Sequence, residues 1–128
     1  MERESGHQGR HQLLREIYDA ANRGDFDALL DRLHADIVWM TPTRRITGRN
    51  QVAGWLIGWH ASAAPTHHPE RFIDVDASTV AFVSISYTDG RPDNHPAHVW
   101  RFRDDLVVRV EVFPQRDDAL SARRPETD

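Results

Sequence analysis

Two apolar strands joined by a short turn, in residues 95–116 (HPAHVWRFRDDLVVRVEVFPQR), constrain the fold of this chain more than any other stretch. A two-residue turn at 104–105 would place two arginines of the first strand on the same face as the valines of the second, which buries charge. We therefore predict a three-residue loop at 103–105 that pairs Phe102 with Leu106. The last loop residue, an aspartate, then takes the left-handed backbone conformation, which glycine adopts best and aspartate tolerates.

This register gives the hairpin one apolar face that also carries a histidine. The face consists of His98, Trp100, Phe102, Leu106, Val108, Val110 and Val112. The opposite face mixes charged and apolar side chains, namely Val99, Arg101, Arg103, Val107, Arg109, Glu111 and Phe113. Such a mixture is common at protein interfaces, and a two-fold dimer is the commonest homo-oligomer. We therefore predict a homodimer through this outer face of the sheet.

The composition narrows the class of protein. A length of 128 residues fits one domain, and the 39% apolar and 28% charged fractions are those of a soluble globular protein. No apolar run approaches the roughly 18 residues of a membrane span, and the lack of cysteine fits a cytoplasmic location. A net charge of −4 argues against non-specific nucleic-acid binding. We expect a flexible N-terminus (1–10), one domain (11–120) and a flexible tail (121–128).

Hydrophobic spacing is helical in the first half of the chain and alternating later. Helices are predicted over 11–22, 26–33 and 50–60, and strands over 37–40, 72–75 and 80–88 ahead of the hairpin. In the last of these strands, the residues predicted to face the core are Ala81, Val83, Ile85 and Tyr87. The connection at 61–70 carries two prolines and is expected to be mobile. Helices that precede an antiparallel sheet indicate an α+β fold.

Short motifs lie at the ends of these elements. They are NRGDF at 22–26, LHAD at 33–36, the proline after the first strand, GR at 48–49, and the closing VWRFRDDLVVRVEVFP. Together they resemble the SnoaL-like group of the nuclear transport factor 2-like superfamily, over about residues 11–120. The resemblance implies a cone-shaped, cystatin-like roll, in which three N-terminal helices pack on a curved, mainly antiparallel sheet around an apolar cavity. The superfamily includes polyketide cyclases, ketosteroid isomerases, scytalone dehydratases and limonene epoxide hydrolases.

The resemblance to ketosteroid isomerases indicates where catalytic groups would lie. Their general base, an aspartate before the proline that follows the first strand, falls on Thr41. Their first-helix tyrosine, which donates to the substrate oxygen, falls on Ile17, next to Tyr18. Their second donor, a protonated aspartate, falls on His98. Two of the three roles are missing, which argues against steroid isomerisation by that mechanism.

His98 is the strongest candidate for chemistry because it is the polar side chain on the apolar face of the hairpin. Burial favours the neutral imidazole, which can act as a general base or donate a hydrogen bond near pH 7. The alternative is a structural histidine that a neighbouring side chain or water satisfies. Tyr87, late in its strand, and Thr41 are predicted to assist His98 as catalytic groups.

The cavity is expected to take a small apolar or aromatic molecule. The predicted ligand-binding residues are Trp39, Trp55, Trp100, Phe102, Val110, Val112 and His60, with the aromatic core as the alternative for the tryptophans. His60 lies with His67 and His68 around the connection at 61–70, which would be either a lid or a solvated loop. Although the chain has eight histidines, no spacing such as HExxH occurs. We therefore expect no metal and no cofactor.

Two functions remain open from the sequence. The first is a cofactor-independent acid–base enzyme of the isomerase, cyclase, dehydratase or hydrolase type. The second is a non-catalytic module for small-ligand binding or dimerisation. The distinction depends on whether the His98 ring points into an enclosed cavity, with a carboxylate or hydroxyl within hydrogen-bond reach.

Overall fold

A six-stranded sheet forms the frame of the molecule in the computed structural model, which describes residues 5–122. The strand order is β2-β1-β6-β5-β4-β3, and all neighbours pair antiparallel except β1 and β6. The strands are β1 (Leu33–Met40), β2 (Arg45–Thr47), β3 (Thr66–Val75), β4 (Ser78–Ser86), β5 (Ala97–Arg103) and β6 (Leu106–Phe113). The helices within the described residues are α1 (Ser5–Arg23), α2 (Phe26–Leu30), α3 (Arg49–Ala63) and α4 (Arg116–Ala122). The expected α+β class is confirmed.

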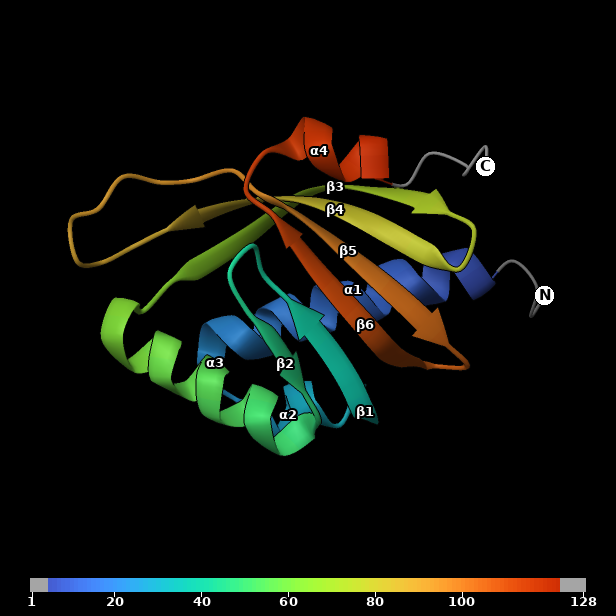
Figure 1. The fold of residues 1–128 in the computed structure, drawn as a ribbon, viewed down its shortest axis with the longest axis horizontal. Helices are drawn as coiled ribbons and strands as arrows, with labels where there is room; N and C mark the ends of the chain where they lie inside the picture. The colour runs from blue at the N-terminus through green and yellow to red at the C-terminus, as the bar shows by residue number, and fades with distance from the viewer. Residues whose placement is uncertain (1–4, 123–128) are drawn as a thin grey trace.

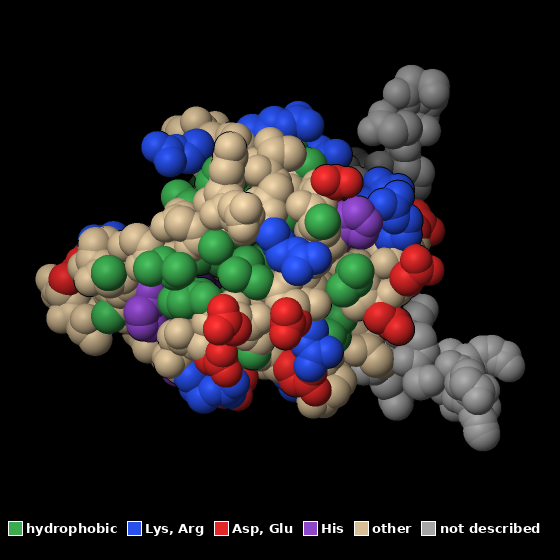
Figure 2. All heavy atoms as spheres, turned by 90° about the horizontal axis from the view of Figure 1, so that it is seen from below, with side chains coloured by type: hydrophobic (Ala, Val, Ile, Leu, Met, Phe, Trp, Pro, Cys, Tyr) green, Lys and Arg blue, Asp and Glu red, His purple; other side chains and the backbone are tan. Residues whose placement is uncertain are grey.

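The sheet curves around α1, while α2 and α3 close the space below and beside it (Figure 1). Figure 2 shows the surface from below, where hydrophobic side chains gather in places among the charged ones. α1 turns one apolar stripe to the sheet, where Leu14, Ile17 and Tyr18 are buried. The helix ends where Gly24 takes a left-handed conformation with φ 73°. The Asp25 side chain then accepts a hydrogen bond from the backbone N–H of Ala28 and caps α2. This local chemistry fixes the sharp turn between the two helices.

Several elements are longer than the sequence predicted. α1 begins at Ser5 rather than near His11, and β1 begins at Leu33 because α2 is only five residues long. The prediction of a mobile connection over 61–70 is wrong, because α3 runs to Ala63 and β3 already begins at Thr66. Ladder pairing with β4 outweighs the two prolines there. The expected flexibility of residues 1–4 and 123–128 falls outside the described part of the chain.

The turn between β5 and β6 also differs from the prediction. Arg103 pairs with Leu106 across a two-residue turn, so the predicted pairing of Phe102 with Leu106 is wrong. The positive φ, 59°, lies at Asp104 and not at Asp105. A two-residue hairpin turn matches the twist of its strands, and aspartate tolerates the left-handed conformation that the turn needs.

A β-bulge removes the difficulty that made the two-residue turn look unfavourable. The register shifts by one residue between Arg101 and Phe102, which pair with residues 109 and 107. As a result Val107, near the turn, and Val110, beyond the bulge, both face inward and are fully buried. Arg101 stays exposed. The predicted outward position of Val107 is therefore wrong, because one inserted residue reverses the facing of a strand.

The helix α4, which the sequence analysis did not predict, covers part of the outer sheet face (Figure 1). Its Ala119 is fully buried and packs in an apolar cluster with Val80 and Val99. Val99 was predicted to lie in a dimer interface, but it is only 2% exposed beneath this cluster. Arg101 and Arg109 remain exposed on the same face, opposite one another in the ladder. The homodimer through the outer face stays a prediction.

Candidate ligand pocket

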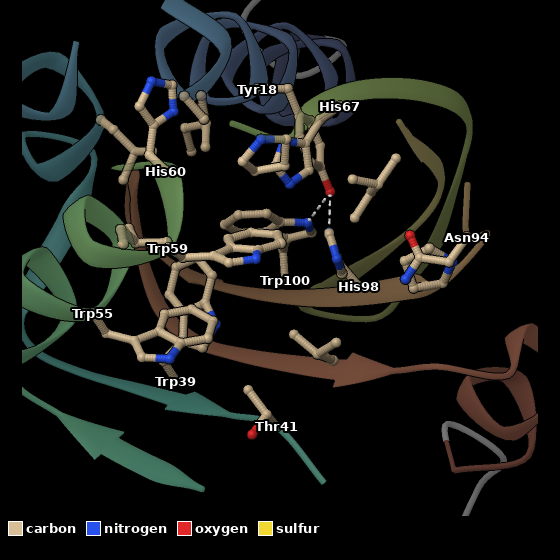
Figure 3. Close-up of a pocket in the computed structure, with 18 of the residues that line it drawn as sticks. Tyr18, Trp39, Thr41, Trp55, Trp59, His60, His67, Asn94, His98 and Trp100 are labelled. Atoms are coloured by element: carbon tan, nitrogen blue, oxygen red, sulfur yellow. Dashed lines mark hydrogen bonds between the residues drawn. The ribbon is translucent and has the colours of Figure 1, made fainter. Parts of the chain in front are cut away.

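A cavity of about 290 Å³ lies between the concave face of the sheet and the helices α1, α2 and α3. This volume is at the lower end of the range of about 300–1,000 Å³ for small-molecule sites. Its wall consists of Ile17, Tyr18, Ala21, Phe26, Leu29, Trp39, Thr41, Trp55, Leu56, Trp59, His60, Pro65, His67, Ile85, Tyr87, Asn94, Pro96, His98, Trp100, Val112 and Pro114. The wall is therefore mostly apolar and aromatic, with a few polar side chains (Figure 3).

Most of the residues predicted for the site line this cavity. They are His98, Tyr87, Thr41, Trp39, Trp55, Trp100, Val112 and His60. Two predicted ligand-binding residues lie outside the wall. Phe102 sits at the turn end of β5, where the Arg10 guanidinium lies 5.7 Å from its ring centre. Val110 is fully buried in the core. Both residues were assigned to the site because they were predicted to share a strand face with His98. The cavity occupies only one end of that face.

The polar centre of the cavity is a chain of hydrogen bonds from Trp100 through Tyr18 to His98 (Figure 3). The Trp100 indole N–H donates to the Tyr18 hydroxyl oxygen at 2.9 Å, and that hydroxyl lies 2.8 Å from Nδ1 of His98. All three side chains are buried. Burial raises the pKa of the Tyr18 hydroxyl well above its usual value, so the hydroxyl keeps its proton.

This chain fixes the tautomer of His98. The Tyr18 hydroxyl already accepts from Trp100, and His98 Nδ1 is the acceptor within reach of its proton among the described residues. A buried O–H without an acceptor would lose its hydrogen bond in full, so Tyr18 donates to Nδ1. Burial, and secondly the neighbouring His67, lower the pKa of His98 to about 3. At neutral pH His98 is therefore uncharged and carries its proton on Nε2, the nitrogen that remains for a ligand.

A second buried histidine, His67 of β3, lies beside this chain. Its ring centre is 5.8 Å from that of Tyr18 and 6.2 Å from that of His98. Nδ1 of His67 is enclosed and has no hydrogen-bond partner among the described residues. Burial, followed by nearby histidines, lowers its pKa to about 4, so this ring is also neutral at pH 7.

Asn22 holds the backbone at His67. Its side-chain amide donates to the carbonyl oxygen of His67 at 2.8 Å and accepts from the N–H of His67 at 2.7 Å. This two-point contact ties the end of α1 to the beginning of β3. It fixes the position from which the His67 ring enters the cavity.

The four tryptophans of the chain all line the cavity. Trp39 packs between Trp55 and Trp100, with ring centres 5.9 and 5.8 Å away, and Trp55 stacks on Trp59 at 5.8 Å. The indole N–H of Trp39 is buried without a hydrogen-bond partner among the described residues. Flat apolar surfaces of this kind fit a planar, ring-containing ligand.

The rim of the cavity includes Tyr87 and Asn94 from the segment between β4 and β5. The Tyr87 hydroxyl donates to the Asn94 side-chain oxygen at 3.2 Å, and the Arg91 guanidinium lies 4.8 Å from the Tyr87 ring centre. Burial raises the pKa of Tyr87, so its hydroxyl also remains protonated. Thr41 lies on the wall between β1 and β2 and offers one further hydroxyl group.

No carboxylate belongs to the cavity wall within residues 5–122. In that part of the chain, no group of three or more acidic or histidine side chains is arranged to hold a metal ion either. What the arrangement offers is a mostly apolar site with hydrogen-bond donors on the hydroxyls and on the neutral rings of His67 and His98. Such a site can bind and polarise an oxygen atom, because hydrogen bonds are stronger in surroundings of low dielectric than in water.

Three polar residues of the site, Tyr18, His67 and Asn94, were missing from the predicted set. The isomerase comparison placed the tyrosine role at Ile17, but Tyr18 presents its hydroxyl to His98. The helical spacing of the buried residues in α1 includes both positions, so periodicity alone could not choose between them. His67 was assigned to a loop, and only its pairing with Ile85 in the sheet places it in the cavity.

The helices within residues 5–122 lack the length and apolar character needed to cross a membrane. Similarity to solved structures supports the same fold. TerC, co-crystallised with polyporic acid, is 17% identical with TM-score 0.75, over 90% of this chain and 97% of that one. A protein from Sinorhizobium meliloti proposed to be a polyketide cyclase is 17% identical with TM-score 0.74, over 79% and 93%. One from Kribbella flavida proposed to be a ketosteroid isomerase is 20% identical with TM-score 0.74, over 83% and 77%.

Other solved structures with this arrangement are described as having a cystatin-like fold, which confirms the expected architecture. Comparison with functionally curated proteins finds no match. The family model for the SnoaL-like domain matches residues 14–110, which is most of the chain. The chain therefore belongs to the SnoaL-like family.

Proposed function

We propose that this protein binds a small, largely apolar molecule with planar rings, and that His98 donates a hydrogen bond to an oxygen of that molecule. The single observation that carries the proposal is the Trp100–Tyr18–His98 chain, which leaves a neutral Nε2–H for a ligand. A hydrogen bond from this N–H to a ligand oxygen would form in mostly apolar surroundings, where it is stronger than in water. The aromatic wall supplies the apolar surface for the rings.

The electrostatics of the wall favour an uncharged ligand. No acidic, lysine or arginine side chain lines the cavity within the described residues, and the two innermost titratable rings, His67 and His98, are neutral at pH 7. Transfer of an isolated charge into such surroundings is strongly unfavourable. The co-crystallisation of TerC, which shares this fold, with polyporic acid supports the proposal of a small organic ligand.

Intrinsic fluorescence provides a direct test, because every tryptophan of the chain lies in the cavity wall. We expect saturable quenching when a planar aromatic ketone such as 9-fluorenone is added to the full chain. The matched control is Ala21→Phe, which fills the cavity from α1 with an added ring. It should weaken binding at least tenfold while the circular dichroism spectrum stays unchanged. The proposal fails if no planar ketone of two or three rings gives saturable quenching.

A second candidate function is acid–base catalysis on the bound molecule. The observation in its favour is that a neutral imidazole donor aimed at a carbonyl oxygen would stabilise the enolate formed from it. Thr41 and Tyr87 would assist from the rim. Against it, the described wall offers no carboxylate to take a proton. Simple binding is therefore favoured over turnover.

The two functions separate in deuterium oxide. An enzyme of this type would exchange the protons next to the carbonyl of 1-tetralone, and the exchange would depend on His98. A binding protein would protect or leave unchanged the exchange rate seen in buffer. Mass spectrometry of the recovered ketone measures the incorporated deuterium. An exchange rate equal to that of buffer would eliminate the catalytic candidate for this substrate class.

A further inference from the structure

Two buried imidazole rings from different strands meet at one place in the cavity (Figure 3). His67 of β3 is 8% exposed and His98 of β5 is 6% exposed, and their ring centres are 6.2 Å apart. The strands that carry them are not neighbours in the sheet, since β4 lies between them. This meeting therefore depends on the curvature of the sheet and is not a local consequence of the sequence.

The hydrogen-bonding state of each ring follows from its surroundings. Nδ1 of His98 accepts from Tyr18, so the His98 proton is on Nε2. Nδ1 of His67 is enclosed and unpartnered in either neutral tautomer, so Nε2 is the nitrogen of that ring that is left to bond to a ligand. With its proton on Nε2, His67 would donate into the cavity as His98 does. Both rings then act as donors.

We propose that His67 and His98 donate hydrogen bonds to the same carbonyl oxygen of the ligand. This inference rests on the proposed binding function and narrows it to ketones and quinone-like molecules. An N–H···O distance of about 2.9 Å puts the shared oxygen about 4 Å from each ring centre. Ring centres 6.2 Å apart then subtend an angle of about 100° at the oxygen. That angle is within the broad range of directions from which a carbonyl oxygen accepts two hydrogen bonds.

The pair also provides specificity. A ketone supplies the acceptor that both N–H groups need, whereas a hydrocarbon of the same shape leaves both groups unpartnered. Sites built to hydrogen-bond a ligand reject analogues that lack the group, because buried donors lose their partners. We expect the ketone to bind ten- to a hundredfold more tightly than the hydrocarbon.

Asn22 acts in this arrangement as a positioning residue. It does not line the cavity, but its amide holds both backbone groups of His67. A change at Asn22 should therefore lower the preference for the ketone more than it lowers affinity for the hydrocarbon. That difference separates positioning of the His67 ring from a general loss of stability.

The test uses 9-fluorenone and fluorene, which share a ring system and differ at the carbonyl. Their affinities for the full chain are measured by tryptophan fluorescence, and the carbonyl stretch of bound 9-fluorenone is measured by infrared difference spectroscopy. Two hydrogen bonds should move the stretch to a lower wavenumber than in hydrocarbon solvent. His67→Phe keeps an aromatic ring. It should remove about half of this shift and lower the ratio of the two affinities at least tenfold. The matched control is His68→Phe, because His68 is exposed on the same strand.

The outcomes are distinct. Binding of both probes with equal affinity would overturn the donor pair but leave the proposed binding function intact. Binding with selectivity that His67→Phe does not alter would assign the oxygen to His98 alone and would also overturn the pair. Failure of both probes to bind would count against the proposed function and the donor pair together. The infrared shift in the wild-type protein needs no variant, so a variant that fails to fold does not remove the test.

Discussion

The hydroxyl of Tyr18 can be removed with little change of shape by Tyr18→Phe, which breaks both hydrogen bonds of the buried chain. The Trp100 N–H and the Nδ1 of His98 would then be buried without partners. Each buried polar group left unsatisfied costs about 1–3 kcal/mol. Allowing for partial relaxation around the deleted oxygen, we expect Tyr18→Phe to lower the free energy of unfolding by about 2–4 kcal/mol.

The chain contains a matched control for this change. Tyr87→Phe deletes the same atom, but the hydroxyl of Tyr87 makes a single bond, to Asn94, at an exposed position. Its loss should cost less than about 1 kcal/mol. Urea unfolding followed by circular dichroism gives both free energies, with equal dependence on urea as the check that the unfolded states match. Equal destabilisation by the two variants would refute the assignment of Tyr18 as the centre of a buried hydrogen-bond chain.

Three further predictions concern acid, backbone and assembly. Because burial depresses the pKa of His67 to about 4 and that of His98 to about 3, the unfolded chain binds more protons below about pH 6.5. Stability should therefore be complete above that pH and fall as the pH drops toward 4. His67→Phe should reduce this loss of stability by up to about 3 kcal/mol, as measured by urea titrations across the pH range. Gly24→Ala should destabilise by about 1–2 kcal/mol, because φ is 73° and the added carbon would lie 3.3 Å from a histidine ring. Gly58→Ala, in open space on α3, should be neutral or stabilising. Thermal melts of both variants measure this difference, and a larger loss of stability in Gly58→Ala than in Gly24→Ala would contradict the backbone argument. Sedimentation at tens of micromolar should show a dimer, and a wild-type monomer would rule out the predicted interface.

Much of the fold followed from local patterns in the sequence. The NRGDF motif fixed the end of α1 and the start of α2, because Gly24 supplies the left-handed residue and Asp25 supplies the cap. Alternation in β4 correctly gave the inward set, in which Ala81 and Val83 are fully buried. These signals are strong because a turn needs particular residues and a half-buried strand needs a period of two.

The register of the hairpin could not be predicted from the local sequence pattern. The rule that charged side chains are not buried was correct, but it led to the prediction of a three-residue loop. The chain instead keeps the charges outside with a two-residue turn and a β-bulge. A bulge inserts one residue and restores the facing beyond it, and nothing in the valine-rich stretch marks its position. The helix α4 was missed for a related reason, since the outer sheet face that it covers exists only after the sheet has formed.

The site divides in the same way. His98 could be selected from the sequence, because a lone histidine on an apolar strand face is conspicuous. The partner that sets its tautomer, Tyr18, lies 80 residues away, and His67 comes from a strand that is not adjacent in the sheet. The sequence by itself determined most of the elements, much of the apolar face and one polar candidate. Only the tertiary structure decided which nitrogen of His98 remains for a ligand, because a tautomer is set by a hydrogen-bond partner that sheet curvature and helix packing bring into place.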